Sequence, residues 1–328
     1  MKLYSLAATA VALVFTAGMA TAEDMDKTGW PASFTVGTAS QGGTYFVYGS
    51  GFASLLSDEL GIPGGGEVTG GPMQNMALVH TGEAAFGMST MGPANASVMG
   101  ENPIAPGLKM DKSCAMFPMY KTPFGITTLA STGITSIADI PAGAKIGFGP
   151  AGSTSDTYFP AMLETLGVEF DRRNGSWNDL GSQLQDGLLD VIAFAVGIPT
   201  PAVSQLEVQA EVNFVDFTDD EQTKVLESFP VADFTIESGT YSTLDRDLKS
   251  VSMWNFGIAN CDLPESFVYE ATKVIMSDNE RMMGIHKAAR ETVFANWDKN
   301  KVLMWHPGAA KYFNENGATI AADQIYGG

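Results

Sequence analysis

Histidine, cysteine and basic residues are scarce in this chain of 328 residues, and each shortage argues against one class of site, scaffold or partner. The three histidines, His80, His286 and His306, show no metal-ligand spacing such as His-Glu-x-x-His, so we expect no metal site. Two cysteines are too few for a disulfide-dense scaffold. The 18 basic residues face 37 acidic ones, for a net charge of −19, which argues against nucleic acids and anionic membrane surfaces as partners.

Long apolar runs are also missing after the N-terminus, where no stretch reaches the roughly 18 residues of a membrane-spanning helix. At the N-terminus itself, Lys2 precedes an apolar run over residues 3–19, and Ala20-Thr-Ala22 follows with the small residues of a cleavage site. Residues 1–22 therefore have the pattern of a secretory signal peptide, and Glu23 would begin the mature chain. We expect an exported protein.

Nucleotide-binding and hydrolase motifs are absent as well. The glycines Gly37, Gly42 and Gly43 do not fit G-x-G-x-x-G, and no Gly-Lys-Ser/Thr follows them. The run Gly152-Ser-Thr-Ser155 is not the Gly-x-Ser-x-Gly elbow of a serine hydrolase. We expect neither catalytic residues nor a cofactor, while a secreted enzyme stays open as the alternative.

The most informative stretch is Phe34-Thr-Val-Gly-Thr-Ala-Ser-Gln-Gly-Gly-Thr-Tyr45. It predicts a strand, a glycine turn and a helix that runs to about Leu60, with Thr44 as N-cap and Gly61 as C-cap. The free backbone N–H groups at such a helix start, and the positive end of the helix dipole, attract anions. The two adjacent glycines would let a ligand approach the backbone. The alternative is that these glycines only make the turn.

Strands and helices continue to alternate beyond this unit. After a loop over residues 64–71, a helix begins near Pro72, a strand covers residues 84–88, and a further helix follows. This order predicts a mainly parallel sheet with ligand-binding loops at the carboxyl ends of its strands. The polar residues at those places are Gln74, Asn75, Ser89 and Thr90. Taken alone, Asn75 is better explained as an ordinary helix-start residue.

A second strand–turn–helix unit appears at Gly147-Phe-Gly-Pro-Ala-Gly-Ser-Thr-Ser-Asp156. Two such units predict two α/β domains whose anion-binding loops face each other across a cleft. An adhesion or immunogenic surface protein on the same fold is a further alternative, which the paired turns disfavour. The arginines lie outside both turns, so we expect helix N-termini, hydroxyls and backbone amides, rather than a guanidinium, to bind a carboxylate. Lys121 is either a hinge-side cation or, more simply, a surface residue.

The chain order also predicts how the two domains are connected. A strand leaves the first domain near Lys121, and a long strand over residues 250–259 carries the chain back. We therefore expect a two-segment hinge, with domain 1 formed by residues 23–121 plus 254–328 and domain 2 by residues 122–253.

The two cysteines lie on these connecting strands. Cys114 begins the strand that leaves domain 1, and Cys261 ends the strand that returns to it. If the strands lie side by side and antiparallel, both cysteines sit at the end remote from the hinge, and an oxidising compartment lets them pair. Two separate buried thiols are the alternative.

The stretch Gly37-Thr-Ala-Ser-Gln-Gly-Gly-Thr-Tyr45 resembles the opening motif of the TAXI family of TRAP-transporter solute receptors. Further stretches agree with that family in order and spacing: Gly71-Pro-Met-Gln-Asn75, Gly82-Glu-Ala-Ala-Phe-Gly-Met-Ser89, Gly133-Ile-Thr-Ser-Ile-Ala-Asp-Ile140, Gly147-Phe-Gly-Pro-Ala-Gly-Ser153, Gly197-Ile-Pro199, Gly239-Thr-Tyr241 and His306-Pro-Gly-Ala309. The resemblance covers essentially the whole mature chain.

The resemblance implies a periplasmic binding protein of the two-domain, hinge-closing kind (type II-like), a monomer that delivers a small organic acid to an ion-driven TRAP permease. Glutamate, 2-oxoglutarate and related dicarboxylates are the ligands it implies. By position, it assigns to the ligand site Gly43, Thr44, Tyr45, Asn75, Ser89, Ser153, Ser155 and Pro199. The chain departs from the family at Gly152-Ser-Thr-Ser155, where members often have Gly-Ser-Gly-Thr, and at Ser89-Thr-Met91, where many have Gln-Ser-Asp. These departures leave the exact ligand open.

Overall fold

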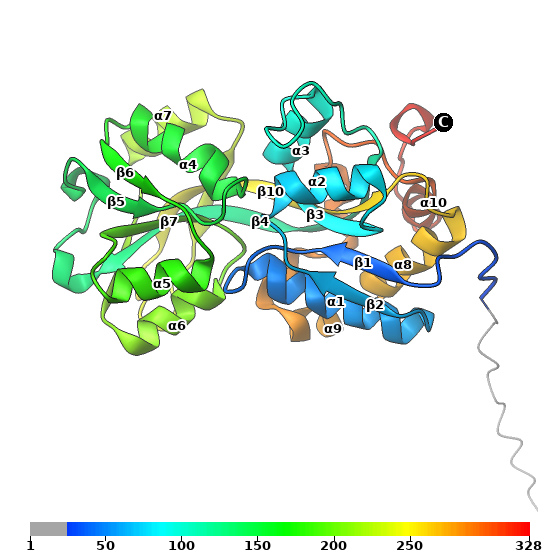
Figure 1. The fold of residues 1–328 in the computed structure, drawn as a ribbon, viewed down its shortest axis with the longest axis horizontal. Helices are drawn as coiled ribbons and strands as arrows, with labels where there is room; N and C mark the ends of the chain where they lie inside the picture. Colours follow the sequence, from blue (N-terminus) through cyan, green and yellow to red (C-terminus); the bar gives the residue numbers. More distant parts are fainter. Residues whose placement is uncertain (1–24) are drawn as a thin grey trace, which may run out of the picture.

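The structure is a computed structural model that describes residues 25–328. The predicted signal peptide, residues 1–22, lies outside the described residues. Two α/β lobes stand side by side, and two long strands, β4 (Ser113–Leu129) and β10 (Leu248–Asn260), run through both of them (Figure 1). The fold is therefore α/β, as the alternation of strands and helices in the sequence predicts. Among the described residues, no helix is both long and apolar enough to cross a membrane.

The first lobe is built on a sheet with the strand order β2-β1-β3-β10-β4. Strand β1 is parallel to β2 and β3, and β10 runs antiparallel to β3. The strands that belong only to this lobe are β1 (Phe34–Gly37), β2 (Gly64–Glu67) and β3 (Phe86–Thr90). Its helices, drawn on both faces of the sheet in Figure 1, are α1 (Thr44–Leu60), α2 (Pro72–Thr81), α3 (Met91–Met99), α8 (Glu265–Ser277), α9 (Asn279–Ile285) and α10 (Pro307–Glu315).

The second lobe continues the sheet in the order β4-β7-β5-β6, with β8 added to β4 and β9 added to β10. Its strands are β5 (Ala144–Gly147), β6 (Phe170–Arg173), β7 (Val191–Ala195), β8 (Val212–Val215) and β9 (Ala232–Ile236). Its helices are α4 (Thr154–Thr165), α5 (Trp177–Gln185), α6 (Pro201–Gln209) and α7 (Asp219–Ser228). Short 3₁₀ helices cover Ala130–Thr132, Ile137–Asp139, Lys287–Glu291, Phe294–Lys299 and Ala322–Gln324.

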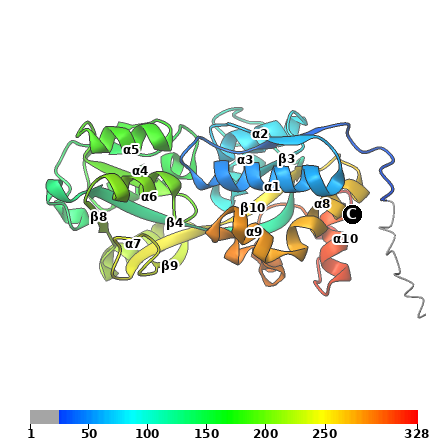
Figure 2. The same cartoon turned by 90° about the horizontal axis from the view of Figure 1, so that it is seen from below.

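Each lobe has its own apolar core. In the first lobe Phe34, Phe86 and Phe267 pack together, with ring centroids 5.4 to 6.2 Å apart. In the second lobe the sheet separates two clusters, one beneath α4 and α7 and the other beneath α5 and α6 (Figures 1 and 2). A sheet buried on both faces needs strands that are apolar throughout, which explains the sequence Val-Ile-Ala-Phe-Ala of β7. Because the faces are covered, the loops at the strand ends remain for ligand binding.

Two expectations about strands are wrong. The sequence pattern predicts a strand over residues 114–120 that ends before Lys121-Thr-Pro123, whereas β4 is one continuous strand that passes there from the first lobe to the second. Residues 64–71 are not all loop, because β2 pairs with β1 in parallel. Glycine is needed at Gly64, since the Phe34 ring occupies the place where a Cβ would stand. A strand made mostly of glycines carries no side-chain pattern, so the sequence could not reveal it.

One helix also ends earlier than its sequence pattern indicates. The periodicity predicts a single helix over residues 279–297, whereas α9 ends at Ile285 and the chain continues as 3₁₀ turns. His286 is extended there, with φ −157°. The side-chain amide of Asn279 donates to the carbonyl oxygens of Ala289 and Thr292, at 2.7 and 2.9 Å, and so stabilises the folded-back segment.

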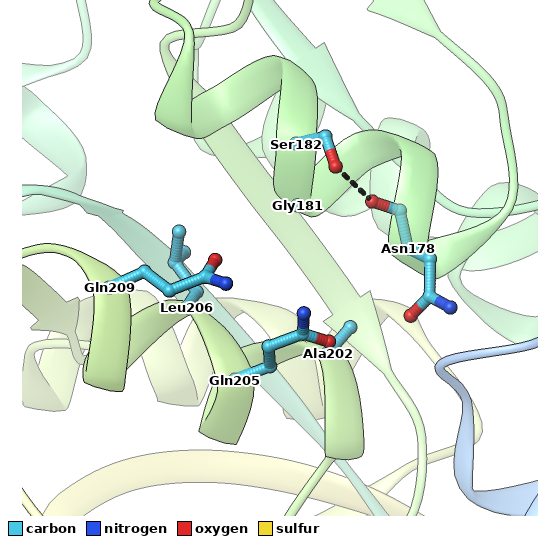
Figure 3. Close-up of a pocket in the computed structure, with 7 residues that line it drawn as sticks. All are labelled: Asn178, Gly181, Ser182, Ala202, Gln205, Leu206 and Gln209. Carbon is cyan, nitrogen blue, oxygen red and sulfur yellow. Dashed lines mark hydrogen bonds between the residues drawn. The ribbon is translucent and has the colours of Figure 1, made fainter.

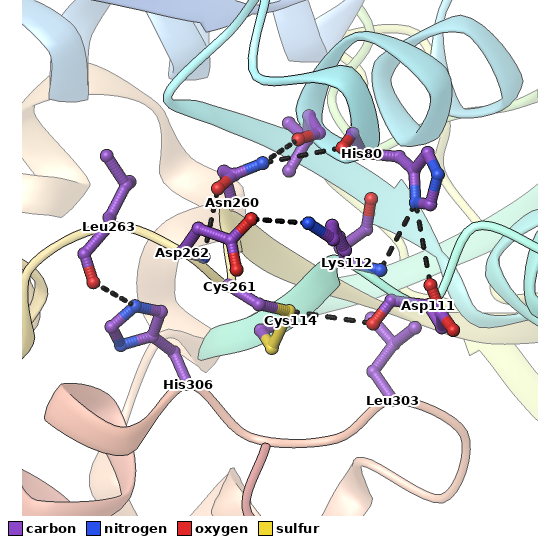
Figure 4. Close-up of a disulfide and its surroundings, with 12 residues drawn as sticks. His80, Asp111, Lys112, Cys114, Asn260, Cys261, Asp262, Leu263, Leu303 and His306 are labelled. Carbon is purple, nitrogen blue, oxygen red and sulfur yellow. Dashed lines mark hydrogen bonds and ion pairs between the residues drawn. A yellow bond between two sulfur atoms is a disulfide. The ribbon is translucent and has the colours of Figure 1, made fainter. Parts of the chain in front are cut away.

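A disulfide joins Cys114 and Cys261, whose Cα atoms are 5.3 Å apart (Figure 4). Both cysteines are buried. Cys114 lies opposite Ala259 in the antiparallel ladder of β4 and β10. The bond therefore closes the end of this strand pair that is remote from the second lobe.

His306, near the disulfide in Figure 4, is fully buried at the start of α10. Its Nδ1 accepts a hydrogen bond from the Gly308 N–H at 3.1 Å, so Nε2 carries the proton and donates to the Leu263 carbonyl oxygen at 3.1 Å. Burial lowers the pKa of His306 from 6.5 to about 4. The folded protein therefore holds this imidazole in its neutral form.

We expect stability to fall as the pH drops from about 6.5 to about 4, because the unfolded chain binds a proton there that the folded chain excludes. A shift of this size corresponds to about 3 kcal/mol in the free energy of unfolding. Urea melts at pH 7 and pH 4 measure it. His306→Asn is the control, because asparagine keeps an acceptor at the helix start but does not titrate. An equal loss in both proteins would assign the pH dependence to other groups.

Candidate ligand-binding site

A cavity of about 30 Å³ lies between the two lobes. The residues that line it come from both lobes and from the strand that joins them: Ala39, Gly43, Thr44, Tyr45, Gly71, Pro72, Thr90, Thr122, Pro150, Ser153, Thr154, Trp177, Ala195 and Val196. None of these lining residues is charged. Within residues 25–328, no cluster of three or more His, Cys, Asp or Glu side chains could hold a metal ion.

The first wall of the cavity is the N-terminus of α1. Gly43 is the N-cap, with φ −94°, and the helix begins at Thr44. The expectation that Thr44 caps the helix is therefore wrong. The Thr44 hydroxyl instead donates to the carbonyl oxygen of Gly197 in the second lobe. Gly61 ends the helix in the left-handed conformation, as predicted.

The opposite wall is the N-terminus of α4 in the second lobe. Ser153 is its N-cap, accepting from the Asp156 N–H and donating to the Phe148 carbonyl oxygen, both at 3.2 Å. Arg172 forms an ion pair with Asp156. The guanidinium thus stabilises the first turn of α4 and is not among the cavity-lining residues. Two helix N-termini, each with a positive dipole end and free N–H groups, therefore meet at one uncharged cavity.

A hydrogen-bond network of hydroxyls and one amide connects the two walls. The Tyr45 hydroxyl donates to Asn255 Oδ1 at 2.6 Å, and Thr90 donates to the same oxygen at 2.8 Å. Thr90 Oγ1 is also 2.7 Å from Thr154 Oγ1 across the cleft. The Asn255 amide donates to Thr122 Oγ1 at 2.7 Å. Burial raises the pKa of Tyr45 well above its ordinary value, so its phenol is a neutral hydrogen-bond donor.

Of the predicted site residues, Gly43, Thr44, Tyr45 and Ser153 line the cavity, whereas Asn75 does not. The Asn75 amide donates to the carbonyl oxygens of Thr38 and Met88, and its Oδ1 accepts from Thr69. All of these bonds lie between 2.7 and 2.9 Å. Asn75 therefore holds three segments of the first lobe together rather than pointing at a ligand.

Ser89, Ser155 and Pro199 also lie outside the cavity lining. Ser89 is fully buried in β3, and its hydroxyl donates to the Thr90 carbonyl oxygen at 3.2 Å. Ser155 accepts from the backbone N–H of Ala195 and so joins α4 to β7. The carbonyl oxygen of Pro199 faces His286 from the other lobe. Ser155 thus supports the α4 wall from behind, and Pro199 joins the lobes away from the cavity.

Several residues at the site have a weak signal in the sequence or none. Thr90 is one of the polar residues that the sequence places at a strand end, and Thr154 directly follows the predicted site residue Ser153. Trp177 begins α5 and carries no motif. Asn255 stands within the long strand β10, where nothing distinguishes it from its neighbours. Only the pairing of β10 with β3 and β4 brings it beneath the cavity.

The lobes touch directly around the cavity. The Ala202 N–H donates to the Gly42 carbonyl oxygen at 3.0 Å, next to the bond between Thr44 and Gly197. At the far end His286 Nε2 is 3.1 Å from the Pro199 carbonyl oxygen. Burial lowers the pKa of His286. This is a closed arrangement of the two lobes.

Lys121 lies at the crossing between the lobes. Its ammonium pairs with Glu291 at 3.2 Å and stands 5.1 and 5.6 Å from the ring centroids of Phe234 and Trp254. Lys121 therefore ties the connecting strand to the first lobe's C-terminal segment and is absent from the cavity lining.

A second hollow, of about 120 Å³, opens between α5 and α6 (Figure 3). The side chains around it are uncharged: Asn178, Gly181, Ser182, Ala202, Gln205, Leu206 and Gln209. The hollow belongs to the second lobe alone, so closing of the lobes would not enclose a ligand in it. The cavity between the lobes is the better candidate site.

Three solved structures share this fold at low identity. MatC from Rhodopseudomonas palustris, solved with bound malate, is 14% identical, with a TM-score of 0.58, and the match covers 87% of this chain and 98% of that one. An R. palustris protein solved with adipate is 14% identical, with a TM-score of 0.54 and the same coverage of 87% and 98%. The periplasmic binding protein BugD is 16% identical, with a TM-score of 0.56, and coverage is 88% and 97%. The chain thus has the two-domain fold of periplasmic binding proteins.

A family model agrees with these structures. The model of the NMT1-like family matches residues 36–317, which include both lobes, both connecting strands and every residue that lines the cavity. The chain belongs to the NMT1-like family.

Proposed function

We propose that this protein is a periplasmic solute receptor that captures a small organic acid between its lobes and delivers it to an ion-driven TRAP permease. One observation carries the proposal: the N-termini of α1 and α4, from different lobes, meet at one uncharged cavity. Such a site attracts an anion without a basic side chain. The family and fold support a receptor, and the motif Gly37–Tyr45 supports the TAXI group within it.

The ligand proposed is a carboxylic acid, with glutamate, 2-oxoglutarate and other dicarboxylates as first candidates. One carboxylate would lie against the backbone N–H groups at Gly43, Thr44 and Tyr45, and Ser153 would face its other end. Hydroxyls and backbone N–H groups that bond a charged group contribute about 1.5–3 kcal/mol each. Malate and adipate in the two R. palustris structures belong to the same chemical class.

The proposal requires the lobes to separate and close. A cavity of about 30 Å³ holds little more than water, whereas pockets for small molecules are roughly 300–1,000 Å³. A dicarboxylate therefore needs the lobes further apart than they are here, both to enter and to stay. We assign domain 1 to residues 23–121 plus 254–328 and domain 2 to residues 122–253, with rotation where β4 and β10 cross between them.

We expect a narrow set of organic acids to raise the melting temperature of the mature protein, because a ligand that binds only the folded state adds RT ln(1 + [L]/Kd) to its stability. The same acids should lower the radius of gyration in small-angle scattering, as an open form closes. A thermal-shift screen identifies the ligand, and scattering with and without it measures closure. A stabilising acid that leaves the radius unchanged would contradict hinge closure.

The same samples distinguish a receptor from a secreted enzyme. A receptor returns the acid chemically unchanged after long incubation, and binding saturates at one ligand per chain. Turnover of the bound acid, followed by nuclear magnetic resonance, would favour the enzyme instead.

A further inference from the structure

We propose that Trp177 sets the upper limit on ligand size, so that the site accepts short-chain carboxylic acids and excludes longer homologues. This inference rests on the proposed function, since it concerns the same cavity. Trp177 has the largest side chain of those that line it. It is also nearly completely buried, with an exposed fraction of 3%.

The indole is fixed between two glycine turns, one from each lobe. On the first-lobe side, a Cβ on Gly43 would lie 2.7 Å from Trp177 Cδ1. On the second-lobe side, a Cβ on Gly149 would overlap the six-membered ring of the same indole. Both turns thus lack side chains where the indole passes. The ring fills the space between the two helix N-termini that would hold the ligand.

The other walls offer little room for adjustment. Tyr45, the next largest lining side chain, is tied to Asn255 at 2.6 Å. Pro72 and Pro150 have rigid rings, and the remaining lining residues are small. The bulk at position 177 therefore decides how long a ligand the closed form can enclose.

The backbone that carries the indole is held in place as well. Trp177 is the first residue of α5, whose N-cap Ser176 accepts from the Asp179 N–H at 3.2 Å. Its neighbours Leu180 and Leu184 belong to the same apolar cluster. A longer ligand could not push the ring aside without disturbing this helix. The wall is rigid, so a size limit should be sharp.

The test is a chain-length series on wild type, Trp177→Phe and Trp177→Leu, measured by isothermal titration calorimetry. The probes are acetate, propionate and butyrate, and malonate, succinate, glutarate and adipate. We expect the best-bound acid to be longer in Trp177→Leu than in wild type, with Trp177→Phe between them. Near the limit, each methylene changes relative affinity by roughly 10–200-fold. Trp177→Phe is the milder change, and it carries the test if Trp177→Leu does not fold.

Trp297→Leu is the matched control, because this half-buried tryptophan belongs to the first lobe and does not line the cavity. We expect it to keep the wild-type length profile. An unchanged profile in a folded Trp177 variant would overturn the size limit and leave the receptor function standing. Failure of wild type to bind any acid of the series or of the wider screen would overturn the receptor function, and the size limit with it.

Discussion

Replacing Gly43 with valine should abolish ligand binding and leave the protein folded. A Cβ at this position would stand 2.7 Å from Trp177 Cδ1 and 3.3 Å from the Ser40 carbonyl oxygen. The first contact joins the two lobes, so the added side chain holds them apart. Gly43 has φ −94°, which valine adopts without strain, and it lies in the turn before α1, at the cavity between the lobes. We therefore expect loss of closure rather than of fold.

The expected loss of affinity is at least about a hundredfold, since more than one charge-assisted hydrogen bond of roughly 1.5–3 kcal/mol depends on closure. Calorimetry measures binding, and circular dichroism confirms folding. Gly65→Val is the matched control, because a Cβ at Gly65 would meet nothing within 4 Å. Ser153→Ala should weaken binding less, because the backbone N–H groups of α4 remain. Wild-type affinity in folded Gly43→Val would place the ligand elsewhere.

Removing the disulfide should produce the largest change in stability. Changing Cys114 and Cys261 together to alanine frees a loop with a sequence separation of 147 residues. Chain-entropy arguments give up to about 5 kcal/mol for such a loop, and losses of about 2–5 kcal/mol are usual for native disulfides. We expect the free energy of unfolding to fall within that range. Ligand affinity should change little, because neither cysteine lines the cavity.

Two controls separate the covalent bond from the packing of its sulfur atoms. A reductant should lower the melting temperature of wild type toward that of the double variant and should not affect the double variant. Thiol titration of unfolded, unreduced mature protein should find no free thiol. Two titratable thiols would contradict the disulfide.

Much of the fold could be predicted from the sequence because it depends on local signals. The bounds of α1, Thr44–Leu60, follow from the Gly42-Gly43 pair before the helix and from Gly61 after it. The continuity of β4 could not be predicted, because Pro123 usually interrupts a strand and here its neighbours on β10 hold it in line. The end of α9 at Ile285 could not be predicted either. Helical spacing of apolar residues continues there, but the Asn279 amide bonds favour a different path.

The candidate site was harder to predict because it is made where distant segments meet. Glycine and hydroxyl motifs indicate Gly43 and Ser153 directly, since a turn before a helix has a sequence signature. Asn75 has the same kind of signature, yet its amide is fully used within the first lobe. Trp177 and Asn255 reach the cavity only through the arrangement of α5 and β10. A polar residue in a motif can therefore be assigned to the ligand site only if its hydrogen-bonding groups are not already used within the protein. Its position in the motif is a weaker indication.

The position of β10 has a consequence for how the chain is made. In the first lobe this strand lies between β3 and β4, although it is synthesised more than a hundred residues after them. Until it emerges from the ribosome, the N-terminal segment lacks the strand that joins β3 to β4. The segment that contains β5 to β8 needs no later strand to complete its pairing with β4. The second lobe can thus pair β5 to β8 with β4 first, but its apolar core, like the first lobe's sheet, is completed only when β10 is made, since Val251 and Met253 belong to that core.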